Sequence, residues 1–188
     1  MKKIIFLLLT FTAVFYLFSC GGGGPEDSEI RTTVESLVAD AAPLNEIYFG
    51  KGLPSDILRP GVGNYMYISS DAEYGSIEQI KEATREIFSA EYSEILFENA
   101  FSGTNEEGIG INYALYAEKN GELMINSKAE RMITGTRIYH FDTIKVIKKS
   151  SETVFVEIDT EDDSGAAAKV KLKLVSEDGK WLLDSPTY

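Results

Sequence analysis

The spacing of the apolar residues changes once along this chain, and that change restricts the fold more than any other feature. Over residues 30–48 and 77–101, apolar residues recur every three or four positions, as they do on one face of an amphipathic helix. From residue 111 onward they alternate with polar residues, as in strands that bury one face. Helices followed by a run of strands predict the α+β fold class.

Helical segments are expected in the first half. The first begins after Ser28 as its N-cap, and its apolar stripe consists of Ile30, Val34, Leu37, Val38, Ala41, Leu44, Ile47 and Tyr48. Pro43 lies inside this stripe, so either the helix kinks there or a second short helix starts at Pro43. Another helix is expected to begin at Ser76, with Gln79 completing a capping box, and a further one to follow Ser89.

The second half is expected to form an antiparallel meander. Strands are predicted at 111–118, 122–126, 141–149, 152–160, 167–176 and 180–185. Asn-Gly at 120–121 and Asp-Gly at 178–179 suit the tight hairpin turns that need positive φ. Ahead of these strands, residues 50–63 are rich in Gly and Pro and predict a loop, and residues 65–68 predict a short extended piece. The meander should curl, with the long first helix covering its concave face.

The N-terminus has the features of a targeting segment. Lys2 and Lys3 precede an apolar run over residues 4–18 and the small residue Ser19. A basic start, an apolar stretch and a small residue before the cleavage point predict a secretory signal peptide over residues 1–19. The alternative is a transmembrane helix, because the run approaches the ~20 residues needed to cross a bilayer.

Residues 17–20, Leu-Phe-Ser-Cys, resemble the signal box of bacterial lipoproteins. The resemblance implies that Cys20 receives a diacylglycerol through its thiol and becomes the new N-terminus after cleavage. The glycines and acidic residues that follow predict a flexible tether over residues 20–28, ahead of a single domain at 29–188. We therefore expect an extracytoplasmic protein of the bacterial cell envelope, held at the membrane by its N-terminal lipid.

Charge and composition exclude several classes of function. With 18 Lys and Arg against 30 Asp and Glu, the chain has a net charge of −12 and should repel nucleic acid and anionic lipid surfaces. One Cys and one His rule out internal disulfides, thiolate zinc clusters and multi-histidine metal sites. The acidic run 159–165 fails as a calcium loop, because Ser164 and Val170 occupy the positions of the glycine and the bidentate acid. We expect an acidic hairpin tip there, with no metal and no cofactor.

The order of elements, closing with Gly-Lys-Trp-Leu-Leu at 179–183, resembles the nuclear transport factor 2-like superfamily, also described as cystatin-like cone folds. Residues 48–54 are similar to a loop of secreted domains of this kind. The resemblance spans roughly residues 29–188 and implies a cone-like domain. Enzymes of the superfamily, such as ketosteroid isomerase-like and polyketide cyclase-like members, use acids, tyrosines or histidines inside the cone. This chain contains no motif that identifies residues equivalent to those catalytic groups.

Few residues offer catalytic chemistry. His140 is the only imidazole, and strand alternation would place it on one face with Asp142, whose carboxylate could orient it as a general base. The alternative is a solvated pair at the start of a strand. Residues 108–110 lack the rest of a phosphate loop, and neither Gly-x-Ser-x-Gly nor His-Glu-x-x-His is present. Trp181 is expected in the core.

Tyrosines are the candidate ligand-binding residues. Tyr65 and Tyr67, and likewise Tyr113 and Tyr116, offer large amphipathic faces that suit a sugar ring or a protein partner. The alternative is that these groups only pack helix against sheet, although alternation should turn at least one residue of each group outward.

The first functional hypothesis is a monomeric, non-enzymatic binding module whose concave face or rim loops engage a cell-envelope protein or glycan. The second is an isomerase or cyclase-type enzyme that uses His140 or Asp142 in a cone pocket. The third is a structural role in envelope assembly. An enclosed polar pocket would favour ligand binding or catalysis, whereas a cone filled by its own side chains would favour binding of a protein.

Overall fold

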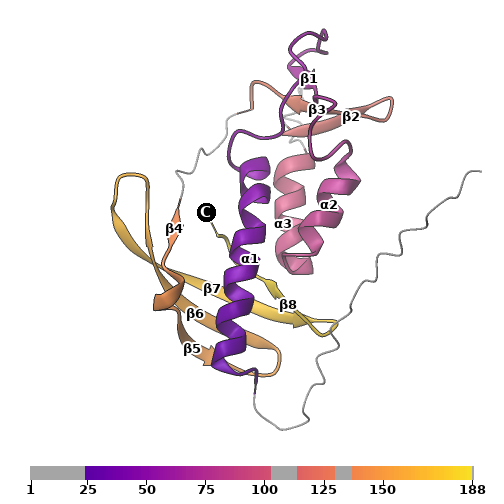
Figure 1. Cartoon of the computed structure of the whole chain (residues 1–188). Helices are drawn as coiled ribbons and strands as arrows, with labels where there is room; N and C mark the ends of the chain where they lie inside the picture. The colour runs from indigo at the N-terminus through magenta and orange to yellow at the C-terminus, as the bar shows by residue number, and fades with distance from the viewer. Residues whose placement is uncertain (1–23, 103–113, 130–136, 188) are drawn as a thin grey trace, which may run out of the picture.

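The computed structural model describes residues 24–102, 114–129 and 137–187, which fold into helices packed on a strongly curled antiparallel sheet (Figure 1). This confirms the α+β class. The helices within these residues are α1 Asp27–Tyr48, α2 Ile77–Arg85 and α3 Ala90–Phe101. The strands are β1 Tyr65–Tyr67, β2 Tyr116–Lys119, β3 Glu122–Asn126, β4 Ile138–Tyr139, β5 Lys145–Lys149, β6 Thr153–Glu161, β7 Ala167–Glu177 and β8 Lys180–Leu183.

Helix α1 buries the whole predicted apolar stripe and runs through Pro43 without a second start. Pro43 is exposed, so its ring points to solvent, and its missing N–H removes only the bond to the carbonyl of Ala39. The helix begins one residue before the predicted cap Ser28, with Glu26 as N-cap and no side-chain cap bond. Asp27 and Glu29 in its first turn suit the positive end of the helix dipole instead.

Helices α2 and α3 begin at the serines that the sequence indicates. The hydroxyl of Ser76 accepts a hydrogen bond from the Gln79 amide at 3.2 Å, and Ser89 accepts one from the Tyr92 amide at 3.0 Å. The Gln79 side chain reaches back to the amide of Gly75 at 2.7 Å, one residue beyond the expected position for a capping box. The first residues of both helices are therefore determined by hydrogen bonds between residues that are close in sequence.

The described strands form two sheets, so the prediction of one meander is wrong. Strands β1, β3 and β2 make a three-stranded sheet, and β4 to β8 make a five-stranded one. β1 precedes α2 and α3 in the chain but pairs with β3, for example Met66 with Ile125. The small sheet lies beyond the C-terminal end of α1, and the large sheet crosses its N-terminal half (Figure 1). Local alternation cannot reveal a pairing between strands so far apart in sequence.

A short 3₁₀ helix, η1 Phe141–Thr143, interrupts the strand predicted at 141–149. β4 and β5 lie on either side of it and pair with the same strand, β6. The hydroxyl of Thr143 accepts from the Asp159 amide at 3.0 Å and donates to the His140 carbonyl at 2.7 Å. The hydroxyl of Thr143 thus accepts the hydrogen bond from β6 that a backbone carbonyl would accept in a continuous strand.

The other hairpin predictions hold. Asn120 and Gly121 have φ of 56° and 79°, and Asp178 and Gly179 have 49° and 79°, as two-residue turns of this type require. Both turns connect neighbouring antiparallel strands, β2 to β3 and β7 to β8.

One hydrophobic core joins both sheets to the helices. Its members from the large sheet, the small sheet and α1 include Val156, Ile158, Leu172, Tyr116, Ile125, Val34 and Leu44. Every second residue of β6, from Val154 to Thr160, is buried against this core. The alternate residues of β6 lie on the opposite face, which we call the outer face of the large sheet.

Candidate functional site

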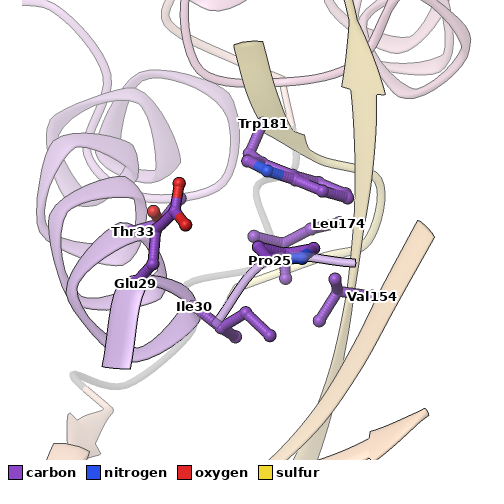
Figure 2. A pocket seen from close by; sticks show the side chains of 7 residues that line it. All are labelled: Pro25, Glu29, Ile30, Thr33, Val154, Leu174 and Trp181. Carbon is purple, nitrogen blue, oxygen red and sulfur yellow. The ribbon is translucent and has the colours of Figure 1, made fainter. Parts of the chain in front are cut away.

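The concave side of the large sheet is filled by the protein's own side chains. The hollow between α1 and the sheet has no room for a water molecule and is lined by Pro25, Glu29, Ile30, Thr33, Val154, Leu174 and Trp181 (Figure 2). The ring of Trp181 lies beside Leu174 and Pro25, and the residue packs against the core, as expected. The space between α1 and the large sheet therefore offers no ligand pocket.

The structure does not bring His140 and Asp142 together as a catalytic pair. Asp142 is exposed on η1 rather than in a strand, so the alternation argument fails. His140 follows β4, and its Nε2 lies 3.4 Å from Oε1 of Glu161. Glu161 pairs with Ile138, which is 53% exposed, so His140 faces outward with them. A solvated position fits both residues better than acid–base chemistry in a cavity.

Two of the candidate tyrosines are structural. Tyr116 is fully buried; its hydroxyl donates to the carbonyl of Ile47 at 2.9 Å and accepts from the amide of Leu53 at 3.1 Å. Tyr65 is half-buried and donates to the carbonyl of Ala114 at 2.9 Å. For these two, packing of the fold is the better interpretation. Tyr113, like Cys20 and the signal segment, lies outside the described residues.

Of the four candidate tyrosines, Tyr67 remains as a possible ligand-binding residue. It lies beside residues 53–63, a loop that we call the rim loop. The amide of Asp56 donates to the carbonyl of Tyr67 at 2.8 Å, and a second bond joins the amide of Ser69 to the carbonyl of Pro54 at 2.9 Å. At its far end the loop closes in a tight turn between Val62 and Tyr65. Backbone bonds thus fasten the rim loop to β1 and the segment that follows it.

Arg59 holds the middle of the rim loop. Its guanidinium donates two hydrogen bonds to the carboxylate of Glu122, at 2.6 and 2.7 Å, and stacks 3.4 Å from the centroid of the Tyr67 ring. The hydrogen bonds from Arg59 hold the pKa of the Glu122 carboxyl below its ordinary value. Sequence analysis missed this pair, because 63 residues separate its members and no motif marks either one.

Between its anchoring points the rim loop exposes large apolar side chains. Ile57 is 82% exposed and Leu58 is 90% exposed, and Val62 nearby is 40% exposed. The amide of Leu58 donates to the Asp56 carboxylate at 2.9 Å, which fixes the turn that carries both residues. Two neighbouring aliphatic side chains are therefore presented to solvent on a fastened loop.

A hollow of about 280 Å³, which we call the distal groove, opens beside the rim loop. It is lined by Asp56, Arg59, Tyr67, Ile68, Ser69, Ser70, Ala72, Tyr74, Gly75, Gly121, Glu122 and Leu123. Burial, and secondarily the neighbouring Glu73 carboxylate, raises the pKa of Tyr74, which stays a neutral hydroxyl. Aromatic faces with hydroxyl and carboxylate groups suit a polar ligand or the side chains of a protein. One lining hydroxyl, that of Ser69, donates to the carboxylate of Asp71 on the same turn.

The acidic run at 159–165 covers the end of β6 and the turn that leads to β7, which is the predicted hairpin tip. Oδ1 of Asp162 accepts from the Ser164 amide at 2.8 Å, the Ser164 hydroxyl at 2.6 Å and the Ala166 amide at 3.0 Å. These hydrogen bonds lower the pKa of Asp162. Within the described residues, no three His, Cys, Asp or Glu side chains gather as ligands for a metal ion.

The rim loop and the start of the domain lie at opposite ends of α1 (Figure 1). At the start, Nζ of Lys149 donates to the carbonyl of Pro25 at 3.0 Å and to the carboxylate of Asp27 at 2.7 Å. A helix of 22 residues is about 33 Å long, so roughly that distance separates the two ends.

Neither a protein-family model nor a curated protein matches the chain. None of the helices described in the structure is long and apolar enough to cross a membrane.

Proposed function

We propose that this protein is a lipid-anchored, non-enzymatic binding module of the bacterial cell envelope, with a cone-like domain of the nuclear transport factor 2-like kind. Its N-terminal Cys20 carries the lipid, and the rim loop with the distal groove receives a protein partner. One observation carries the proposal: Ile57 and Leu58 are 82% and 90% exposed on a loop that is fastened along its length.

A fastened loop with exposed aliphatic side chains suits a protein interface for two reasons. Contacts between Ile57 or Leu58 and a partner would remove apolar surface from water, which is the main driving force for association. Because Arg59 and the backbone bonds already order the loop, binding costs little additional conformational entropy. The polar lining of the distal groove supplies hydrogen-bonding groups next to this apolar tip.

The position of the rim loop also supports an anchored binder. The chain enters the domain at Gly24, close to the N-terminus of α1, and the rim loop follows the other end of that helix (Figure 1). A domain held by its N-terminus would thus keep its binding surface remote from the attachment point.

An isomerase or cyclase-type activity has less support. The hollow under α1 admits no water, and His140 contacts Glu161 on the outer face while Asp142 is exposed. A structural role in assembly differs from transient binding only in the stoichiometry of the partner, so the same experiment addresses both.

The test is photo-crosslinking of the full chain in bacteria that produce it. A photo-reactive amino acid at Val62, on the same loop as the exposed pair, should give a crosslinked band whose tryptic peptides include those of a second protein. The double variant Ile57→Ser, Leu58→Ser should abolish this band, whereas Ile95→Ser, an exposed isoleucine on α3, should leave it unchanged. A band that yields peptides of this chain alone and is removed by a muramidase would replace the protein partner by a glycan. No band, or equal loss in both variants, would overturn the proposal.

The lipid anchor has its own test. Cells fed radiolabelled palmitate should label the chain, and Cys20→Ala should remove the label. An unlabelled wild-type chain would contradict the lipid anchor without bearing on the rim loop.

A further inference from the structure

Charge is unevenly distributed over this acidic chain. The three described helices together carry ten acidic and three basic residues. The five strands of the large sheet carry seven lysines and four acidic residues, and three of those acids, Glu157, Asp159 and Glu161, are in β6. The net charge of −12 therefore hides a basic region on the large sheet.

Most of these lysines lie on the outer face of the sheet. Leu172 and Leu174 of β7 point into the core, so the residues that alternate with them point away from it. Register places a lysine on each side of Phe155 and of Glu157 in β6. We call the following set the basic face: Lys145, Lys148, Lys169, Lys171 and Lys173.

Three of these lysines are available to an external anion. Lys169 pairs with Asp159, and Lys173 pairs with Asp184. Lys145, Lys148 and Lys171 are exposed, and within the described part of the chain none of them has a carboxylate oxygen within 4.0 Å. The basic face thus keeps cationic groups that the protein itself does not neutralise.

The chain enters the domain at the end of β5, on the α1 side of the large sheet. A Cβ on Gly24 would lie 2.6 Å from the carbonyl oxygen of Ser150, so this glycine packs directly on the end of β5. Lys149, the neighbour of Lys148, binds Pro25 and Asp27. Four residues lead from Cys20 to Gly24, and four residues span at most about 14 Å. An anchor at Cys20 would keep Lys148 close to the membrane.

We propose that the basic face rests on the anionic headgroups of the membrane in which the chain is anchored, an inference that builds on the lipid anchor proposed above. Net charge alone predicts repulsion. However, the acidic side of α1 lies a helix diameter of about 10 Å beyond the sheet, which exceeds the Debye length of about 8 Å in physiological salt. The outer face itself also carries Glu157, Asp159 and Glu161 of β6, so the five lysines of the basic face leave it with a small excess of positive charge next to the surface.

The anchor makes a small number of lysines sufficient. Each lysine near an anionic surface increases the partition of a protein onto the membrane roughly fivefold. Three such lysines are too few to hold a free protein there. A tether raises the effective concentration of the face at the membrane, so the same interaction can orient the domain. A lipid chain with a basic patch is a recognised pair of membrane-binding signals.

The test measures the orientation of the anchored full chain in vesicles. Acylation consumes the thiol of Cys20, so Ile147→Cys, half-exposed on β5, provides a single site for a bimane label. Leu58→Cys on the rim loop is the reference position. With nitroxide lipid headgroups, the label at 147 should be quenched more in vesicles of phosphatidylcholine with phosphatidylglycerol than in phosphatidylcholine alone. High salt should remove this difference, and the label at 58 should show none.

Charge reversal supplies the matched control. The triple variant Lys145→Glu, Lys148→Glu, Lys171→Glu should reduce quenching at 147 to its level in neutral vesicles. The triple variant at Lys51, Lys119 and Lys128, exposed lysines outside the large sheet, makes the same charge change and should have no effect. Equal quenching at 147 in both lipids, or equal loss in both triple variants, would overturn the inference.

Failure of the anchor is distinguishable from failure of the orientation. If palmitate does not label the chain but the apolar residues 4–18 keep it in the membrane, the measurement is repeated with Cys20→Ser and still reports on the basic face. A chain found only in the culture supernatant would overturn both proposals.

Discussion

Tyr116 shows how an attractive candidate for ligand binding can be a structural residue. Its hydroxyl joins the carbonyl of Ile47 in the last turn of α1 to the amide of Leu53, where the rim loop begins. Both partners are buried, so each would otherwise lose its hydrogen bond to water without replacement. The ring and the hydroxyl together position the rim loop relative to α1.

Removal of this hydroxyl should therefore destabilise the fold. We expect Tyr116→Phe to lower the free energy of unfolding by about 1–3 kcal/mol, because a buried amide and a buried carbonyl lose their partner. Tyr67→Phe is the control: its half-exposed ring stacks on Arg59, and the change should stay within about 0.5 kcal/mol. Urea unfolding followed by Trp181 fluorescence measures both. Equal midpoints for the two variants would contradict the structural role.

The ion pair between Arg59 and Glu122 should make the order of the rim loop depend on pH. Arg59 holds the pKa of Glu122 below its ordinary value, so the pair contributes above the ordinary carboxyl pKa. Its contribution is lost as the pH falls through the lowered pKa and Glu122 takes up a proton. We expect the protection factors of the amides of residues 56–59, which compare their exchange with that of an unfolded chain at the same pH, to fall at acid pH under conditions where β6 stays protected.

Arg59→Ala provides the comparison for that experiment. Without the guanidinium, exchange in the rim loop should be fast at neutral pH, and the carboxyl resonance of Glu122 should titrate at a higher pH. Arg59→Lys should restore little, because an ammonium cannot make the paired hydrogen bonds. A rim loop that exchanges alike in wild type and Arg59→Ala would show that the pair does not order it.

At the scale of elements, α1 connects the two ends of the domain. Its buried stripe packs against both sheets, so the helix must remain continuous for the core to form. Pro43 is the weak point of this helix, because it removes one backbone bond in the interior and clashes with the preceding turn.

Replacement of Pro43 should stabilise the protein. Pro costs about 3 kcal/mol relative to Ala in a helix interior, and the restriction that it places on the unfolded chain offsets up to about 1 kcal/mol of that. We expect Pro43→Ala to raise the free energy of unfolding by about 2 kcal/mol, measured by thermal or urea unfolding. Ala42→Gly, at the neighbouring exposed position, should lower it by about 1 kcal/mol. A loss of stability in Pro43→Ala would contradict the assignment of Pro43 as the weak point of α1.

At the scale of the whole molecule, two sheets share one core. Leu123 and Ile125 of the small sheet belong to the same buried cluster as Val156 and Ile158 of the large sheet. The two sheets should therefore unfold together rather than as separate units.

Hydrogen exchange tests this cooperativity. Ile158→Ala should cost about 2–5 kcal/mol and reduce the protection of amides in β3 as well as in β6, because both depend on one core. Ile138→Ala, at a 53% exposed position in the same sheet, should change neither. If protection of β3 survives Ile158→Ala, the small sheet forms an independent unit.

The amino-acid sequence alone determined the features that depend on neighbours along the chain. The stripe of α1, the caps at Ser76 and Ser89, and the hairpin turns at 120–121 and 178–179 follow from periodicity and backbone conformation. Each of these signals extends over a few residues. Their order along the chain, helices first and strands after, identifies the α+β class. The lipid anchor at Cys20 remains a prediction of the same local kind.

Only the tertiary structure decided what lies next to what. It paired β1 with β3, placed Arg59 on Glu122 and Tyr67, and let Thr143 interrupt a predicted strand. It also filled the space under α1, left Ile57 and Leu58 in solvent, and gathered lysines on one face of an acidic protein. Each of these outcomes depends on packing and hydrogen bonds between residues distant in sequence, which local patterns of hydrophobicity and charge do not encode.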